Sequence, residues 1–264
     1  MKKKQLLTGI LVTLLSLMWG CQFSESDNDK ILTSGSESRR SQAMNLDDDW
    51  EIAGIDHNRG MVFLDKWLET NYDSTWSLST LQLQVRYAAE EFMEDSTSYD
   101  LTIAKSAMDR VAVMEISFNY LSACVDTLIT NEYVSALEET YIRRLLSFVY
   151  KDSLSTYSFQ DSLDLFVGDV KCVEWKEDEI LCLAFAAVLV YSWDYQVAGG
   201  WNFNPDPNDP IFWNGRRTGA ADLAGAVAGG LIGAAGGGAG ALPGAVGGGL
   251  GASAADCVLQ MCGF

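Results

Sequence analysis

The chain has 264 residues and carries 36 acidic side chains against 18 basic ones, a formal net charge of −18. A surface this acidic repels phosphate backbones and gains nothing from anionic lipid head groups, so we expect no nucleic-acid partner. Hydrophobic residues make up 48% of the chain. A chain of this length and composition can bury one sizeable core, which indicates one domain plus a distinct C-terminal segment.

The first twenty residues have the composition of a secretory signal peptide. Three lysines at positions 2–4 precede an apolar run over residues 6–19, and Gly20 closes the run. A basic head, an apolar segment and a small residue before the cleavage site form the pattern that is removed on export. The next residue, Cys21, resembles the lipidated cysteine of a bacterial lipobox. We therefore predict a signal peptide over residues 1–20 and a lipid-bearing Cys21; an ordinary signal peptide with an incidental cysteine is the alternative.

Residues 21–43 are rich in Ser, Asp, Glu and Asn and contain few apolar side chains. Such a composition cannot bury enough surface to fold, so we expect a disordered tether. The acidic residues Glu25, Asp27 and Asp29 resemble the surface-export signals of some Gram-negative lipoproteins, although a solvated spacer explains them equally well. The expected location is the bacterial cell envelope, with a lipid anchor and with the outer-membrane surface as one option.

Residues 44–198 carry apolar side chains at helical spacing and lack any sustained two-residue alternation, which predicts an all-helical domain without strands. Within it we expect a single long central helix over Tyr99–Leu128 and a helix over Asn131–Tyr150 with Asn131 as its N-cap. Residues 180–191 form an uncharged run that is too short to span a bilayer and fits a buried helix. The other expected helices are Glu51–Thr70, residues 78–92, Ser158–Val173 and Glu179–Gln196.

Residues 199–217 hold three of the four prolines and cannot form the interior of a helix or a sheet. We interpret this segment as a linker between the helical domain and the C-terminal segment, residues 218–264.

The C-terminal segment contains no charged residue between Asp222 and Asp256, and its glycines recur every four residues. This spacing places glycines on one face of a helix, where two backbones can approach closely. We predict a glycine-zipper hairpin of two helices, about Gly219–Ala235 and Pro243–Cys257, with Gly230 off the main row. The predicted helix-packing residues are Gly225, Gly229, Gly233, Gly237, Gly240, Gly244 and Gly248.

Three environments suit this hairpin. It can pack in or at a membrane or associate with a second copy of itself, it can pack on its own helical bundle, or the segment can be a flexible linker. The first option adds membrane lipid as a partner of the hairpin as well as of Cys21. The other options describe a structural or interaction protein.

The segment Gly54-Ile55-Asp56-His57-Asn58, the later Tyr191-Ser192-Trp193-Asp194-Tyr195 and the glycine-rich tail together are similar to uncharacterised secreted proteins or lipoproteins of Bacteroidota-type bacteria. The tail by itself resembles the glycine-zipper segments of bacteriocin-like peptides and bacterial envelope proteins. These resemblances imply an envelope protein and bring no activity with them.

Few residues are candidates for chemistry. His57 is the only histidine and lies on an apolar stripe, so we expect it in the core and hydrogen-bonded. Zinc-ligand spacings are absent and the acidic pairs fit solvated helix faces, so we expect no catalytic site, metal or cofactor and do not interpret the protein as an enzyme. Cys257 and Cys262 are candidates for a disulfide if the last helix frays, and otherwise they are packed or free thiols.

Overall fold

The computed structural model of the chain describes residues 51–97, 99–111, 117–150, 156–176, 179–204, 214–236 and 240–262. All regular secondary structure in these ranges is helical, which confirms the predicted all-α class. The predicted signal peptide, Cys21, the tether and Gly237 lie outside the described residues. The helices are α3 (Glu51–Asn71), α4 (Leu78–Ser96), α5 (Leu101–Val111), α6 (Phe118–Thr130), α7 (Ala136–Val149), α8 (Thr156–Lys171), α9 (Leu181–Val197), α10 (Gly215–Ala235) and α11 (Ala241–Met261).

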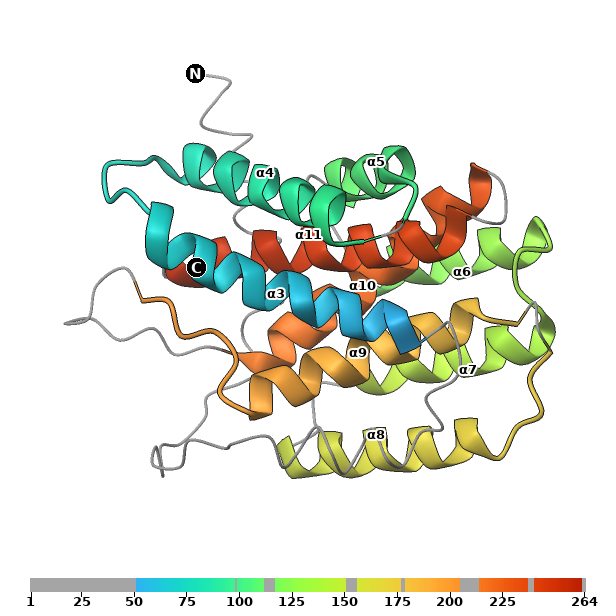
Figure 1. Ribbon diagram of the computed structural model, residues 1–264. Coiled ribbons are helices and arrows are strands. Elements are labelled where there is room, and N and C mark those ends of the chain that lie inside the picture. Colours follow the sequence, from blue (N-terminus) through green and yellow to red (C-terminus); the bar gives the residue numbers. More distant parts are fainter. Residues whose placement is uncertain are drawn as a thin grey trace, which may run out of the picture.

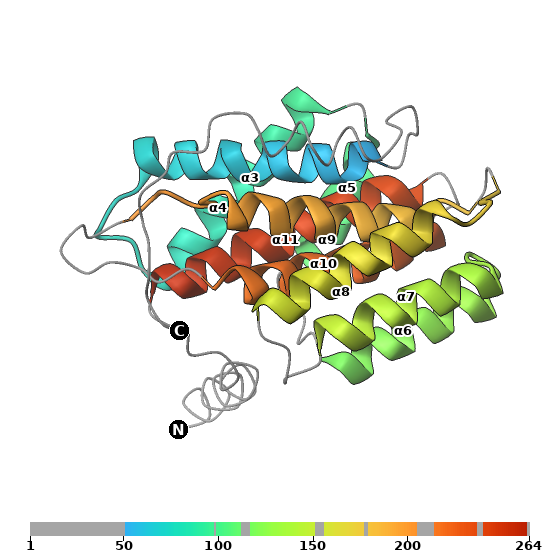
Figure 2. The ribbon, with the colours of Figure 1, turned by 90° about the horizontal axis from the view of Figure 1, so that it is seen from below.

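The two C-terminal helices, α10 and α11, form an antiparallel hairpin in the middle of the bundle (Figure 1). Helices α3, α4, α5 and α9 contact α11, while α5, α6, α7 and α9 contact α10. Helix α8 lies outermost and packs on α7 and α9 (Figure 2). We call α3–α9 the shell. The predicted C-terminal helical hairpin is therefore confirmed, and it packs inside the protein's own bundle.

Burial follows the distribution of apolar residues around each helix. Helices α10 and α11 are apolar on every side, and most of their residues are buried. Helix α9 shares this character, with twelve buried residues over Leu181–Trp193. The other shell helices carry polar residues on one face, which they turn to solvent while the apolar face packs inward.

Two predicted helix boundaries are wrong for the same reason. The expected single helix over Tyr99–Leu128 is two helices, because the Ser117 hydroxyl accepts a hydrogen bond from the Tyr120 backbone N–H and so starts α6 as an N-cap. Asn131 ends α6 and does not start α7, since its own backbone N–H bonds back to the Thr127 carbonyl. Ser135 is the N-cap of α7.

The predicted linker is shorter than expected. Helix α10 begins at Gly215, with the Asn214 side chain accepting a hydrogen bond from the Arg217 N–H as an N-cap. At the other end, the buried Asp65 carboxylate of α3 accepts hydrogen bonds from the backbone N–H groups of Asn202 and Phe203. The first part of the linker is thus fixed to the shell, and its last residues belong to the hairpin.

Glu138 joins two helix N-termini. One carboxylate oxygen accepts a hydrogen bond from the Ser135 backbone N–H at 2.9 Å, which completes a capping box with the Ser135 side chain. The other accepts from the N–H groups of Leu181 and Cys182 at 3.0 and 3.3 Å, at the start of α9, a helix whose own N-cap residue makes no side-chain cap bond. Burial raises the pKa of Glu138, and these backbone hydrogen bonds act in the opposite direction.

We expect Glu138→Gln to lower the free energy of unfolding by about 1–3 kcal/mol, because an amide NH₂ then faces buried N–H groups that lose their acceptor. The control is Glu139→Gln on the same helix, which removes only a half-exposed ion pair with Arg143 and should cost about 0.5 kcal/mol or less. Urea unfolding of both variants measures the difference. Equal losses in the two variants would show that Glu138 does not support the start of α9.

Candidate functional site

The predicted glycine rows face each other across the hairpin. A Cβ added to Gly225, Gly229 or Gly233 would lie less than 3.0 Å from the backbone of α11, a separation that real Cβ atoms essentially never show. The same holds in reverse for the α11 glycines against α10. The opposed pairs, which we call the glycine seam, are Gly225 with Gly248, Gly229 with Gly244, and Gly233 with Gly240. Six of the seven predicted packing glycines thus lie where the spacing placed them.

Other glycines of the hairpin face the shell. On α11, Gly247 lies against the Ala104 backbone of α5, and Gly251 lies against Met108. On α10, Gly230 faces the Phe185 ring of α9, so this position off the main row also lacks space for a side chain. The seam is occupied within one chain, and a second copy of the hairpin would need a different surface.

We expect Gly229→Ala to destabilise the protein by about 1–3 kcal/mol, because the added methyl group overlaps the Gly244 carbonyl and backbone cannot yield as a side chain can. The matched control is Gly168→Ala in α8, where nothing lies within 4 Å of the added Cβ. Alanine favours a helix over glycine by up to ~1 kcal/mol, so this control should be neutral or stabilising. Urea denaturation tests both; a Gly229→Ala protein as stable as the control would contradict close packing at the seam.

A buried polar cluster connects the hairpin to the shell, and we call its four residues, His57, Ser192, Asp222 and Ser253, the buried cluster. All four are at most 1% exposed. The hydroxyls of Ser253 in α11 and Ser192 in α9 donate to the two carboxylate oxygens of Asp222 in α10. The His57 Nε2 of α3 lies 3.0 Å from Ser253 Oγ and 3.6 Å from Asp222 Oδ2. The prediction that His57 is a buried, hydrogen-bonded core residue is confirmed.

A second group of polar contacts lies entirely within the hairpin, at the end furthest from the turn between α10 and α11. Arg217 Nε donates to Asp256 Oδ1 at 2.6 Å. The other Asp256 oxygen accepts from the Thr218 hydroxyl at 3.1 Å and from the Gln260 amide at 2.6 Å. The Gln260 oxygen in turn accepts from the Asn214 backbone N–H. We call this end of the hairpin the base, and the end at Ala235–Gly240 the tip.

Sequence reasoning missed Ser192, Asp222 and Ser253 as partners of His57. The signal in the sequence was that Asp222 interrupts an otherwise apolar helix, and a charge in such a place requires a partner. Its partners lie on three other helices, and one of them, Ser253, is 196 positions from His57 in the chain. The buried cluster resembles a nucleophile–base–acid arrangement in its residue types. Because all four side chains are enclosed, it offers no surface to a substrate.

The cysteines are free thiols in the described residues, so Cys257 and Cys262, the candidates for a disulfide, are unpaired there and follow the alternative of one packed and one free thiol. Helix α11 continues through Met261, which keeps Cys257 buried in the core while Cys262 is exposed at the helix end. Burial also raises the pKa of the Cys124 and Cys182 thiols, and that of Cys182 lies well above its ordinary value. These two thiols are therefore protonated and unreactive near neutral pH.

Maleimide labelling of the native protein at pH 7 should modify Cys172 and Cys262 quickly, because both are exposed. Cys124, Cys182 and Cys257 should react only after unfolding. Peptide mapping by mass spectrometry identifies the labelled sites. If Cys262 reacted only after a reductant was added, the helix end would be frayed and the disulfide would exist after all.

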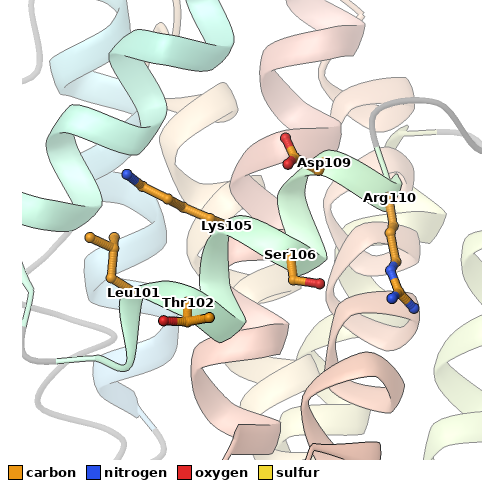
Figure 3. Close-up of a pocket in the computed structure, with 6 residues that line it drawn as sticks. All are labelled: Leu101, Thr102, Lys105, Ser106, Asp109 and Arg110. Carbon is orange, nitrogen blue, oxygen red and sulfur yellow. The ribbon is translucent and has the colours of Figure 1, made fainter.

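A shallow depression of about 560 Å³ lies along the outer face of α5 (Figure 3). All of its described lining residues come from this one helix. The Lys105 ammonium lies 3.7 Å from a Glu90 oxygen and 3.6 Å from a Glu94 oxygen, and Asp109 pairs with Arg86, so these charges tie α5 to α4. The depression is a feature of the surface and contains no buried polar group that could select a ligand.

No family model, curated protein or solved structure matches the chain.

Proposed function

We propose that the protein is a lipid-anchored protein of the cell envelope that holds a membrane-inserting glycine-zipper hairpin inside its helical shell. The observation that carries this proposal is the separation of polar and apolar residues along the hairpin. Charged and amide side chains gather at the base and bond mainly to one another, as Arg217 and Asp256 do. The tip consists of glycine and alanine, and Ala235 and Gly236 are exposed there.

The hairpin can keep its glycine seam and its internal polar contacts on leaving the shell, while lipid would replace its apolar contacts with the shell helices. The glycine seam joins α10 to α11, and the polar contacts of Asp256 stay within the hairpin. Asp222 keeps Ser253 as a partner and loses only His57 and Ser192. Lipid offers no hydrophobic drive for helix association, and close glycine packing is a contact that persists there.

The lengths of the helices fit a bilayer. Each has 21 residues and so spans ~32 Å, against ~30 Å for the hydrocarbon core. Among the described residues, α10 and α11 are the two helices long and apolar enough to cross a membrane by length and composition. The uncharged stretch of α10 beyond Asp222 spans only ~20 Å, so a full crossing requires Asp222 to enter together with Ser253.

The start of helix α3, at Glu51, lies on the same side of the bundle as the hairpin tip (Figure 1), which is compatible with insertion tip first. A lipid on Cys21, joined to Glu51 by the intervening residues, would keep the bundle close to the membrane and so within reach of the hairpin tip. If the target membrane belongs to another cell, the same arrangement describes a bacteriocin-like membrane-active factor.

A permanent core is the second candidate function for the hairpin, in a structural or interaction protein. It is favoured by the burial of most α10 and α11 residues and by the enclosure of Asp222 between α3, α9 and α11. In that case the glycine seam serves only to bring α10 and α11 close enough together for six neighbouring helices to surround them.

A charge at the tip separates the two candidates. Ala235 is exposed, so Ala235→Asp should leave the folded bundle intact, yet a tip that enters first must pass the middle of the bilayer, where an Asp costs about 2.5–3.5 kcal/mol. We expect the variant to release dye from phosphatidylcholine vesicles at least tenfold more slowly than the unchanged protein. Ala123→Asp, an exposed alanine on α6 with the same change in charge, is the control and should retain full release.

Two results would contradict the proposal. If the unchanged protein releases no dye, or if the Ala235→Asp and Ala123→Asp proteins release dye equally, the hairpin does not enter tip first. The permanent-core function would then stand.

A further inference from the structure

The hydrogen bonds of the buried cluster fix where protons must lie. The Asn58 Nδ2 donates to the Tyr191 carbonyl oxygen at 2.7 Å, an atom that can only accept. This contact turns the Asn58 Oδ1 toward the His57 Nδ1, at 3.3 Å. Because an amide oxygen is an acceptor only, Nδ1 of His57 must carry a proton.

The second ring nitrogen of His57 faces Ser253. A serine hydroxyl has a single proton, and Ser253 Oγ contacts both an Asp222 oxygen and the His57 Nε2. If Ser253 donates to an ionised Asp222, it can only accept from Nε2, and His57 is then an imidazolium. If it donates to Nε2, a protonated Asp222 must donate to Ser253. Both arrangements contain one proton more than a neutral imidazole with an ionised carboxylate, and donation by Ser253 to the Gly249 carbonyl oxygen, at 3.1 Å, would require a second.

We propose that the buried cluster holds this additional proton at neutral pH and that the proton ties the hairpin to the shell. Without it, two acceptor atoms face each other with no hydrogen between them, either within the enclosed contacts of Ser253 or between His57 Nδ1 and the Oδ1 of the partly buried Asn58, which is costly. His57 belongs to α3 and Ser192 to α9, while Asp222 and Ser253 belong to the hairpin. The shared proton therefore lies at the contact that must break before the hairpin can leave.

The sign of the pH dependence follows from proton counting. Above about pH 7 an unfolded chain has a neutral histidine and an ionised aspartate, so folding takes up the additional proton. Stability then falls as pH rises, by up to tenfold in the folding constant for each pH unit, until the folded protein also loses the proton. Raising the pH therefore weakens the attachment of the hairpin to the shell.

Other titratable groups lie near the buried cluster. Within the described residues, those that act on it or on its neighbours are Asp256 and Cys257 of α11, Arg217 of α10, Asp65 of α3 and Tyr195 of α9. Asp56, next to His57 in α3, pairs with Arg59 at 2.7 Å. An Asp222→Asn protein keeps all of these groups and removes the Asp222 charge, which also acts electrostatically on Asp256 and Cys257. The comparison with that variant therefore reports on the cluster together with these two contacts.

Asp222→Asn is suited to the test because asparagine can satisfy every bond without the additional proton. Its oxygen can accept from Ser192, its NH₂ can donate to Ser253, and Ser253 can then donate to a neutral His57. We expect this variant to fold. Urea unfolding between pH 7 and 8.5 measures the folding constant of both proteins. For each pH unit, the folding constant of the unchanged protein should fall by up to tenfold more than that of the variant.

Nuclear magnetic resonance gives the direct test, since the full chain has one histidine and hence one imidazole signal. In protein labelled with ¹⁵N at histidine, long-range ¹H–¹⁵N spectra at pH 7 should show a protonated Nδ1, either as imidazolium or as the Nδ1–H tautomer. A bare Nδ1 with a protonated Nε2 would overturn the proposal. Equal pH dependence of stability in the unchanged and Asp222→Asn proteins would overturn it as well.

The role of this proton in hairpin release rests on the proposed function, and vesicle experiments separate the two. Dye release by the unchanged protein should increase from pH 7 to 8.5, while release by the Asp222→Asn protein should not change with pH. Release that is independent of pH in both would overturn the tie between proton and release. An absence of release in both, with the expected spectra, would overturn only the membrane function.

Discussion

The close approach of α10 and α11 is the constraint on which the rest of the structure depends. Along the glycine seam the two backbones touch, and a methyl group at any of six positions would overlap the facing helix. Two helices joined in this way are narrow enough to be enclosed by their neighbours. Glycine in a water-exposed helix is unfavourable, so the seam and the surrounding shell together stabilise a segment that would not be helical alone.

The polar residues of the hairpin lie mainly at one of its two ends. Arg217, Thr218, Asp256 and Gln260 satisfy one another at the base, whereas the tip is small, apolar and partly exposed. Asp222 and Arg216 reach outward, Asp222 to His57 and Ser192 of the shell and Arg216 to the Val149 carbonyl oxygen of α7. The polar residues at the base thus bond largely within the hairpin, and the buried cluster is a main polar attachment of the hairpin to the shell.

Local patterns in the sequence predicted much of this arrangement. The four-residue glycine spacing located the seam, and the apolar stripe located His57 in the core. Two boundaries were wrong because Ser117 and Ser135 cap helices through hydrogen bonds that apolar periodicity does not reveal. The partners of His57 could not be predicted, since they come from helices far apart in the chain, and their meeting depends on how the whole shell packs.

Lipid contact of the hairpin tip tests the central claim most directly. A fluorescent label can be placed on Ala235→Cys at the tip, with Cys172 and Cys262 replaced by serine, or on the natural Cys262 at the base, with Cys172 replaced by serine. Quenchers attached to lipid acyl chains then report the depth of each label in phosphatidylcholine vesicles. Insertion predicts strong quenching at position 235 and little at Cys262. A tip label that remains accessible only to quenchers in the water would contradict the account.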